Sequence, residues 1–198
     1  MSTDTQTLNE DAVCRWLEAN LPGFAGPLEV TKFRAGQSNP TFLLSTPAHD
    51  YVLRRKPPGV LLKSAHAVDR EFRVQKALAG SQVPVARMHL LCIGSMFYVM
   101  DHVPGRNFND PTLPELTPAE RGAVMDEMNG VLAALHEVDI DAAGLSDYGP
   151  PGNYFERQVA RWSKQYRASE TEPQPDMDRL VQRLSAELPE DDGQRTLV

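Results

Sequence analysis

A guanidinium and a carboxylate, placed on a strand and a helix, are the residues best suited to chemistry in this chain. Arg54 ends the apolar run "YVLR", and Glu71 lies inside the helix-like run "DREFRVQKAL". A guanidinium pairs well with phosphate oxygens, and an inward carboxylate needs a cationic partner because an unpaired buried charge is costly. The sequence therefore predicts an Arg54–Glu71 ion pair that orients the cation toward a phosphate. Arg55 and Lys56 compete with Arg54 for this role, and solvated side chains are the alternative for all of them.

Two further segments have backbones that suit a nucleotide. The stretch "FRAGQSNPTFLL" places Gly36 in a loop between two strand-like runs, and exposed backbone N–H groups bind anions. After the apolar run "FYVM", residues 101–103 are extended, and their backbone groups could hydrogen-bond a planar heterocycle such as adenine. An ordinary hairpin turn and an ordinary strand end are the respective alternatives.

The elements that must position these groups occupy residues 1–103. Helical spacing of Val13, Trp16 and Leu17 predicts a first helix, and a second one is predicted around Glu71, closed by Gly80. Five strands are predicted, at "LEVTKF", "TFLLST", "YVLRR", "ARMHLLCI" and "MFYVMDHV". The order is strand, glycine loop, strand, strand, helix, strand, strand, which predicts a compact lobe with one inserted helix.

Residues 117–198 have an almost wholly helical pattern, and residues 104–116 are the predicted linker. Thr117 and Glu120 have the spacing of a capping box. Three amphipathic helices follow from this pattern. The first helix is predicted to have a buried stripe, and the other two have apolar stripes at helical spacing. The residues are Val124, Met128, Val131, Leu132 and Leu135 in the first, Phe155, Val159, Trp162 and Tyr166 in the second, and Met177, Leu180, Val181 and Leu184 in the third.

Bulk properties exclude several classes of protein. The chain has 198 residues and a net charge of −7, which argues against nonspecific nucleic-acid binding. No run approaches the roughly 18 to 20 apolar residues that cross a bilayer, and the polar N-terminus does not resemble a secretion signal. Cys14 and Cys92 lack metal-ligand or disulfide spacing and are predicted to be small buried side chains. We expect a cytoplasmic protein without membrane or nucleic-acid partners.

The order of these features resembles the ATP-binding lobe of protein kinases. More specifically, "GQSNPTF", "YVLRRKPPG", "DREFRVQKAL", "FYVMDHVPGR", "LHEVDIDAAGLSDYGPPGNYFERQVARWSKQY" and "TLV" resemble the aminoglycoside phosphotransferase family. The match is closest to its branch of kinase-like domains joined to acyl-CoA dehydrogenases, and it covers nearly the whole chain. The resemblance implies an α+β, protein-kinase-like fold with a five-stranded antiparallel N-terminal lobe and an incomplete helical C-terminal lobe.

The resemblance also implies roles for individual residues. Gly36, Gln37 and Ser38 would lie in the loop that covers the nucleotide. Arg54 would pair with phosphate, and Glu71 would be its partner from the helix. The segment from Met100 through Asp101 to Val103 would be the hinge that contacts adenine.

In the family that the chain resembles, "TLV" runs into a His-Gly-Asp catalytic loop, followed by the magnesium ligands. This sequence stops at Val198, so we expect no catalytic residue and no metal ligand in it. The candidate substitutes Asp139, Asp141, Asp147, Asp191 and Asp192 are interpreted as caps or solvated charges, and His136 as structural.

We therefore expect the truncated N-terminal part of an ATP- and Mg²⁺-dependent kinase that phosphorylates a hydroxyl of a small molecule. As a fragment it would be inactive. An incomplete helical lobe is expected to expose apolar surface and to self-associate. A non-catalytic kinase-like binding or scaffold domain is the alternative.

Overall fold

The computed structural model describes residues 8–33, 39–57, 66–150, 152–190 and 193–198. The chain divides into two compact units, residues 1–138 together with Val198, and residues 139–197. Each unit is described by itself. The lobe boundary predicted at residues 104–116 stays a prediction.

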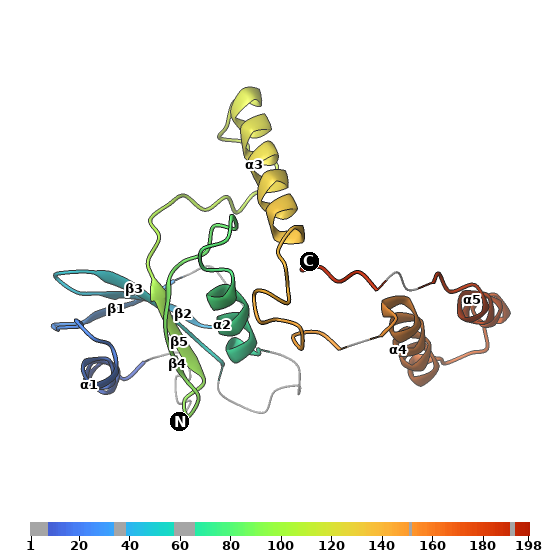
Figure 1. Cartoon of the computed structure of the whole chain (residues 1–198), viewed down its shortest axis with the longest axis horizontal. Coiled ribbons are helices and arrows are strands. Elements are labelled where there is room, and N and C mark those ends of the chain that lie inside the picture. Colours follow the sequence, from blue (N-terminus) through green and yellow to red (C-terminus); the bar gives the residue numbers. More distant parts are fainter. Residues whose placement is uncertain (1–7, 34–38, 58–65, 151, 191–192) are drawn as a thin grey trace. The chain divides into compact units, whose positions relative to one another are not determined.

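The first unit contains a five-stranded antiparallel sheet, as predicted (Figure 1). Its strands are β1 (Glu29–Lys32), β2 (Thr41–Ser45), β3 (Asp50–Arg55), β4 (Met88–Cys92) and β5 (Phe97–Asp101). Their spatial order is β1-β2-β3-β5-β4, so that β3, which bears Arg54, is the central strand. A side chain on a central strand is held by neighbours on both sides, which makes β3 a rigid support.

One face of the sheet packs against helix α1 (Glu10–Asn20). Val13 and Leu17 of this helix are buried against a cluster that includes Leu53 of β3 and Val99 of β5. Asn9 caps the helix by accepting a hydrogen bond from the backbone of Ala12 at 3.0 Å. We call this side of the sheet the α1 face.

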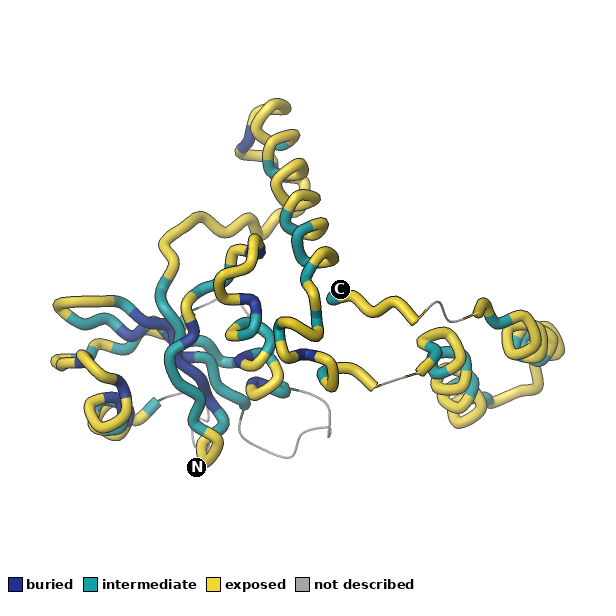
Figure 2. The backbone as a smooth tube through the Cα atoms, viewed as in Figure 1, coloured by how far each residue is buried: buried dark blue, intermediate teal, exposed yellow. Residues whose placement is uncertain are grey.

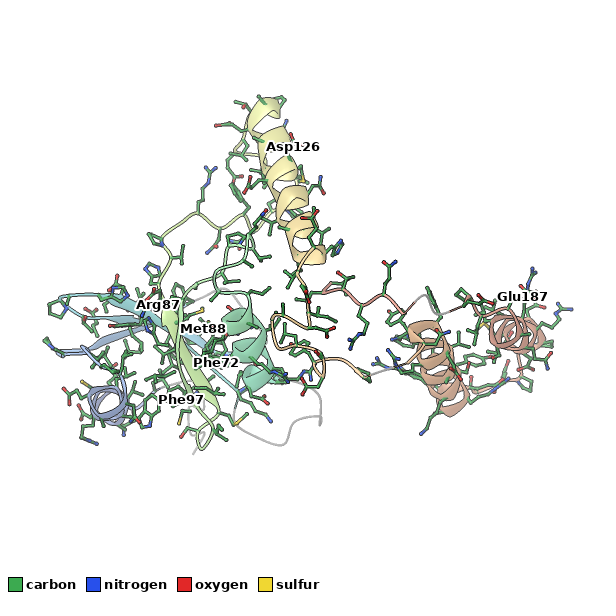
Figure 3. All side chains as sticks on the ribbon, viewed as in Figure 1. Phe72, Arg87, Met88, Phe97, Asp126 and Glu187 are labelled. Atoms are coloured by element: carbon green, nitrogen blue, oxygen red, sulfur yellow. The ribbon has the colours of Figure 1, made fainter. Side chains whose placement is uncertain are left out.

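The opposite face packs against helix α2 (Val68–Ala77), and we call it the α2 face. Its buried cluster joins Val68 and Phe72 of the helix to Met88 of β4 and Tyr98 of β5. Phe72 and Met88 are labelled in Figure 3. Successive side chains of a strand point to opposite faces. Since Leu53 belongs to the α1 face, its neighbour Arg54 lies on the α2 face, beside the helix that carries Glu71.

Three more helices follow, α3 (Pro118–His136), α4 (Tyr154–Ser169) and α5 (Pro175–Ala186). The capping box at the start of α3 is confirmed, because Thr117 and Glu120 each bond the other's backbone N–H, at 3.3 Å and 2.8 Å. In the second unit, Arg167 of α4 forms an ion pair with Asp178 of α5.

The predicted burial of the α3 stripe was wrong, whereas the apolar surface expected to be exposed in the helical part is exposed. None of the described residues of α3, α4 or α5 is buried, and the three helices are mostly exposed in Figure 2. Met128 is 60% exposed, Trp162 55% and Leu184 46%. Helical periodicity fixes which side chains share a face, but burial requires a second surface against that face.

The burial of the two cysteines differs from the prediction. Cys14 and Cys92 are both free, but they are half-buried rather than buried, at the margin of the cluster on the α1 face. Within the part of the chain that is described, no helix combines the length and the apolar character needed to span a bilayer.

Candidate functional site

Arg54 and Glu71 form the ion pair that the sequence predicts. Nε of Arg54 donates to Oε2 of Glu71 at 2.8 Å, and the two side chains are 29% and 33% exposed. Nη1 of Arg54 also donates to Oγ1 of Thr41 on the neighbouring strand, at 3.3 Å. The guanidinium is thus fixed from a helix and from a strand while part of it remains open to a ligand.

Glu71 is the centre of a hydrogen-bond network on the α2 face. Nδ2 of Asn39, which is 2% exposed, donates to Oε1 of Glu71 at 2.8 Å. The hydroxyl of Tyr98 donates to Oε2 at 3.1 Å. Nδ1 of His66 lies 2.7 Å from Oδ1 of Asn39. The carboxylate therefore has partners on both oxygens, which compensates for its partial burial.

Tyr98 is held in its neutral form by this environment. Burial raises the pKa of the Tyr98 phenol to about 12, and the negative charge of Glu71 acts in the same direction. Nε2 of Gln75 donates to the phenol oxygen at 3.4 Å. Because the phenol stays protonated, it is available as a donor to Glu71 throughout the neutral pH range.

The structure distinguishes Arg54 from the two neighbouring cations. Arg55 lies on the α1 face, with its guanidinium carbon 5.7 Å from the centre of the Phe42 ring, and burial lowers the pKa of Arg55. Lys56 follows the end of β3, and its backbone N–H donates to the carbonyl of Met96 at 2.9 Å. Of these three cations, the one paired with Glu71 is Arg54.

The side chains of the predicted hinge residues do not share one face of the sheet. Met100 is opposite Val52 in the sheet and packs on the α2 face, as Arg54 does. Asp101 is opposite Tyr51, a residue of the α1 face, so its side chain points away from Arg54. Val103 follows the strand and is 67% exposed. The backbone N–H of Asp101 is already used, because it donates to the carbonyl of Arg87 at 2.9 Å.

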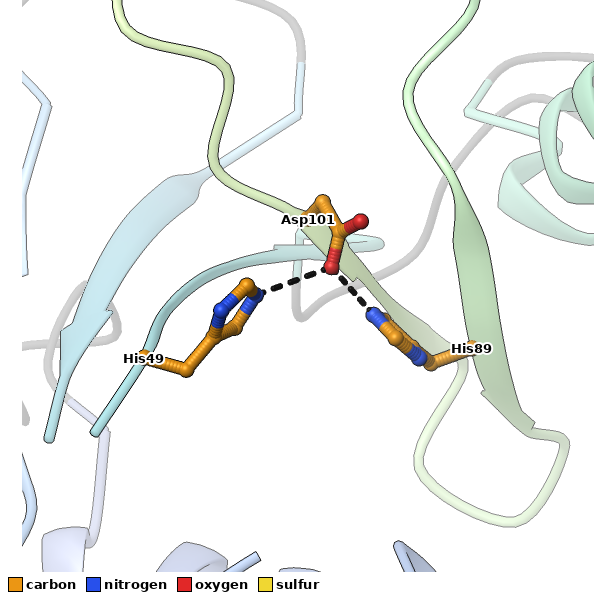
Figure 4. Close-up of side chains that lie close together, drawn as sticks. All are labelled: His49, His89 and Asp101. Carbon is orange, nitrogen blue, oxygen red and sulfur yellow. Dashed lines mark hydrogen bonds and ion pairs between the residues drawn. The ribbon is translucent and has the colours of Figure 1, made fainter. Parts of the chain in front are cut away.

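Asp101 instead belongs to a second polar cluster, on the α1 face (Figure 4). Its Oδ1 lies 3.0 Å from Nε2 of His49 and 2.5 Å from Nε2 of His89. Burial raises the pKa of the Asp101 carboxyl, but the hydrogen bonds and charges of His89 and His49 outweigh burial and lower it overall. No sequence pattern connects these three residues, which are far apart in the chain.

The remaining candidates fall into two groups. Gly36, Gln37 and Ser38 lie outside the described residues, as do Asp191 and Asp192.

Asp139 is a cap, as predicted, since its Oδ1 accepts from the backbone of Asp141 and of Ala142 at 2.9 Å. Asp141 accepts from Ser146 at 2.5 Å and from Arg195 at 3.2 Å. Asp147 lies in the segment between α3 and α4, and His136 is an exposed residue in the last turn of α3.

Five members of the Arg54–Glu71 network were not found from the sequence: Asn39, Thr41, His66, Gln75 and Tyr98. Asn39 follows the glycine loop closely, and a buried amide there is not distinguishable from an ordinary turn residue by type alone. Tyr98 alternates with Phe97 and Val99 in an apolar strand, so its position predicted core packing rather than a hydrogen bond to Glu71.

The sheet, its inserted helix and the paired cation and carboxylate define a kinase-like fold. Among solved structures, a Ralstonia eutropha protein provisionally assigned as an aminoglycoside phosphotransferase matches with a TM-score of 0.77 and 50% identity, over 92% of this chain and 54% of that one. A ternary complex of APH(2″)-IIa with streptomycin and ATP shares the fold, with a TM-score of 0.60 and 16% identity, over 88% and 57% of the two chains.

The chain belongs to the phosphotransferase enzyme family (APH), whose sequence model matches residues 29–198. Curated relatives include acyl-CoA dehydrogenase family member 11 of Rattus norvegicus, 47% identical over 92% of this chain and 25% of that protein. Family member 10 of Mus musculus is 45% identical over 93% of this chain and 18% of that protein. The chain thus spans about a quarter or less of the length of these relatives. The family and the fold expected from the sequence are confirmed.

Proposed function

We propose that this chain is the nucleotide-binding part of an ATP-dependent phosphotransferase that phosphorylates a hydroxyl of a small molecule. The observation that carries the proposal is the ion pair of Arg54 with Glu71, on the central strand and the inserted helix. In phosphoryl transfer the protein acts mainly by positioning and by electrostatic stabilisation of the phosphates. A guanidinium held in place by a carboxylate suits that task, since its geometry is set before the phosphate binds.

ATP is the proposed nucleotide. Solved structures of this fold include complexes with ATP, ADP and GDP, which support a purine nucleotide, and the resemblance of the sequence implies ATP. Arg54 would donate to phosphate oxygens. Glu71 and Thr41 would hold Arg54 in place, and Asn39 would hold Glu71. Residues 36–38 are proposed to cover the phosphates, and the segment from Met100 to Val103 is proposed to contact the base.

Magnesium belongs to the proposed reaction of the full-length protein, but this part of the chain does not fit it. Among the described residues, the group of His, Cys, Asp or Glu side chains suited to hold a cation is His49, His89 and Asp101. Mg²⁺ prefers oxygen ligands, and this group has two nitrogens and lies on the face opposite Arg54. We therefore assign no magnesium ligand and no step through the ion to these residues.

The proposed acceptor is a hydroxylated acyl or lipid-like metabolite rather than an aminoglycoside. The support is the high identity to relatives named as acyl-CoA dehydrogenase family members. Incubating the full-length protein with ATP and a panel of hydroxyacyl compounds and aminoglycosides would test this choice. Phosphate transfer to aminoglycosides alone would contradict it.

A direct test of the nucleotide proposal compares the three competing cations. We expect the chain to bind a fluorescent ATP analogue, and Arg54→Met to weaken that binding about tenfold, the effect of losing about 1.4 kcal/mol from a charge-assisted hydrogen bond. Arg55→Met and Lys56→Met are matched controls and should retain the affinity. Equal losses in all three variants, or no saturable binding by the parent chain, would overturn the proposal.

The alternative is a kinase-like domain that binds or scaffolds without catalysis. The codons that follow Val198 in the gene distinguish the two. A reading frame that continues into His-Gly-Asp supports the enzyme, whereas a stop codon supports the binding domain.

We also propose that the chain associates with itself through the exposed apolar side chains of its later helices. Phe155 and Trp162 of α4 and Leu180 and Leu184 of α5 are each between 45% and 55% exposed. A second copy of the same chain would cover such a surface. A cytoplasmic location, in keeping with two free cysteines, is proposed as well.

A further inference from the structure

Three side chains from separate segments of the sheet bring their donor atoms together on the α1 face (Figure 4). His49 precedes β3, His89 lies on β4, and Asp101 ends β5. One ligand atom from each lies within 4.8 Å of the other two. This cluster takes no part in the Arg54–Glu71 network, which lies on the opposite face.

His89 lies on the α1 face, at an irregularity in strand β4. Met88 is opposite Met100 and Leu90 is opposite Val99, so that His89 is the extra residue of a β-bulge. Met88 packs on the α2 face while Leu90 packs on the α1 face. Because Met88 lies on the α2 face, alternation places its neighbour His89 on the α1 face beside Asp101, and the bulge puts Leu90 on that face as well.

The two histidines also have contacts outside the cluster. The backbone N–H of His49 donates to Oγ1 of Thr46 at 3.0 Å, and the His49 carbonyl accepts from Thr46 Oγ1 at 2.7 Å. The buried ring of Tyr51 lies against both imidazoles, with ring centres 4.5 Å from His49 and 5.4 Å from His89. The arrangement therefore does not depend on a single exposed contact.

Two imidazole nitrogens and one carboxylate oxygen are a ligand set typical of zinc, which binds His at about 2.0–2.1 Å and leaves a fourth position to water in open sites. Such bonds place tetrahedral ligand atoms about 3.3 Å apart. The observed separations from Asp101 Oδ1 are 3.0 Å and 2.5 Å, so these two distances would each lengthen by less than about 1 Å on metal binding, while the two imidazole nitrogens already lie within 4.8 Å of each other. His89 is 13% exposed and His49 47%, which leaves one side open to water.

We propose that His49, His89 and Asp101 form a binding site for a divalent transition-metal ion, with Zn²⁺ the best fit. The metal would replace the protons that the carboxylate and the imidazoles now share, and it would join the turn before β3, strand β4 and the end of strand β5. The site shares Asp101 with the segment proposed to contact the base, but it lies on the face opposite Arg54 and its test uses no nucleotide, so that either proposal can fail without the other.

The test uses the chain without an affinity tag. A chelator first removes bound metal, and the metal-free chain is then titrated with ZnCl₂ by calorimetry at neutral pH. We expect one equivalent to bind, and His49→Gln or His89→Gln to weaken binding at least tenfold. His136→Gln, which removes an exposed histidine of α3, is the matched control and should bind as the parent does. Saturation of the parent without any change in the His49 and His89 variants would overturn the site.

Co²⁺ gives a second readout that does not depend on affinity alone. Tetrahedral coordination of Co²⁺ produces strong visible absorption, which Zn²⁺ should then displace. His49 is the more exposed ligand, so His49→Gln is the variant expected to keep the fold, and circular dichroism without metal verifies this. Absence of both Zn²⁺ heat and Co²⁺ absorption in the folded parent would show that the cluster is only an ion-pair network and would refute the proposal.

Discussion

The guanidinium of Arg54 and the carboxylate of Glu71 are joined by a 2.8 Å hydrogen bond between β3 and α2. The pair is about one-third exposed, so it is neither a solvent-screened surface pair nor a fully desolvated one. The contribution of the pair to the free energy of unfolding is therefore measurable. The pair also connects the fold to the proposed nucleotide site.

A double-mutant cycle should detect this coupling. We expect Arg54→Met and Glu71→Gln each to lower the free energy of unfolding by about 1–2 kcal/mol, with a coupling of about 1 kcal/mol, because each change leaves a partner polar group unpaired. Urea unfolding of the parent, the two single variants and the double variant measures this coupling. Arg183 and Glu187 are an exposed pair on one helix, 74% and 62% exposed, and serve as the control, with an expected coupling of about 0.3–0.5 kcal/mol. Equal coupling in the two cycles would contradict a special role for the Arg54 pair.

Asn39 should be more important to stability than its type suggests. Asn39→Ala removes the hydrogen bond to Glu71 and the contact with His66 from a side chain that is 2% exposed. We expect the free energy of unfolding to fall by about 2–3 kcal/mol, since buried partners lose their hydrogen bonds. Asn20→Ala, which removes an exposed bond to the Trp16 carbonyl, is the control and should cost less than about 1 kcal/mol. A smaller loss for Asn39 than for Asn20 would be evidence against the network.

Tyr98 should make the stability depend on alkaline pH. Its pKa in the fold is about 12, against an ordinary value of 10.0, so the folded state holds the proton more tightly than the unfolded state does. This contribution is complete below pH 10 and is lost as the pH rises toward 12, at about 1.4 kcal/mol per pH unit.

Urea unfolding of the parent and of Tyr98→Phe at several pH values tests this expectation. The difference between the two free energies of unfolding should fall between pH 10 and 12, because the other titrating groups cancel. Tyr154→Phe, which removes an exposed phenol from α4, is the control. A parent-minus-variant difference that is constant over this range would contradict the raised pKa of Tyr98.

The exposed side chains of α4 and α5 should cause concentration-dependent association. We expect light scattering after size-exclusion chromatography to give a mass that rises with concentration, and Trp162→Gln combined with Leu184→Gln to suppress the rise, because less apolar area is then buried. Gln182→Ala, an exposed change on α5, should have no effect. A monomer at all concentrations would rule out this association.

Much of the local structure follows from sequence patterns. Alternation and turn residues placed the five strands correctly, and helical spacing placed α2 around Glu71. The capping box of Thr117 and Glu120 was also readable, since it depends on residues three positions apart. These features are local, so the spacing of residue types along the chain suffices to predict them.

The tertiary structure decided what the sequence left open. Alternation requires Arg54 and Arg55 to point to opposite faces, but only the packing of α2 shows which face carries Glu71. It also set Asp101 between His49 and His89, which come from separate segments of the sheet. The physical reason is that strand pairing joins residues far apart in the chain, whereas periodicity describes only neighbours along it.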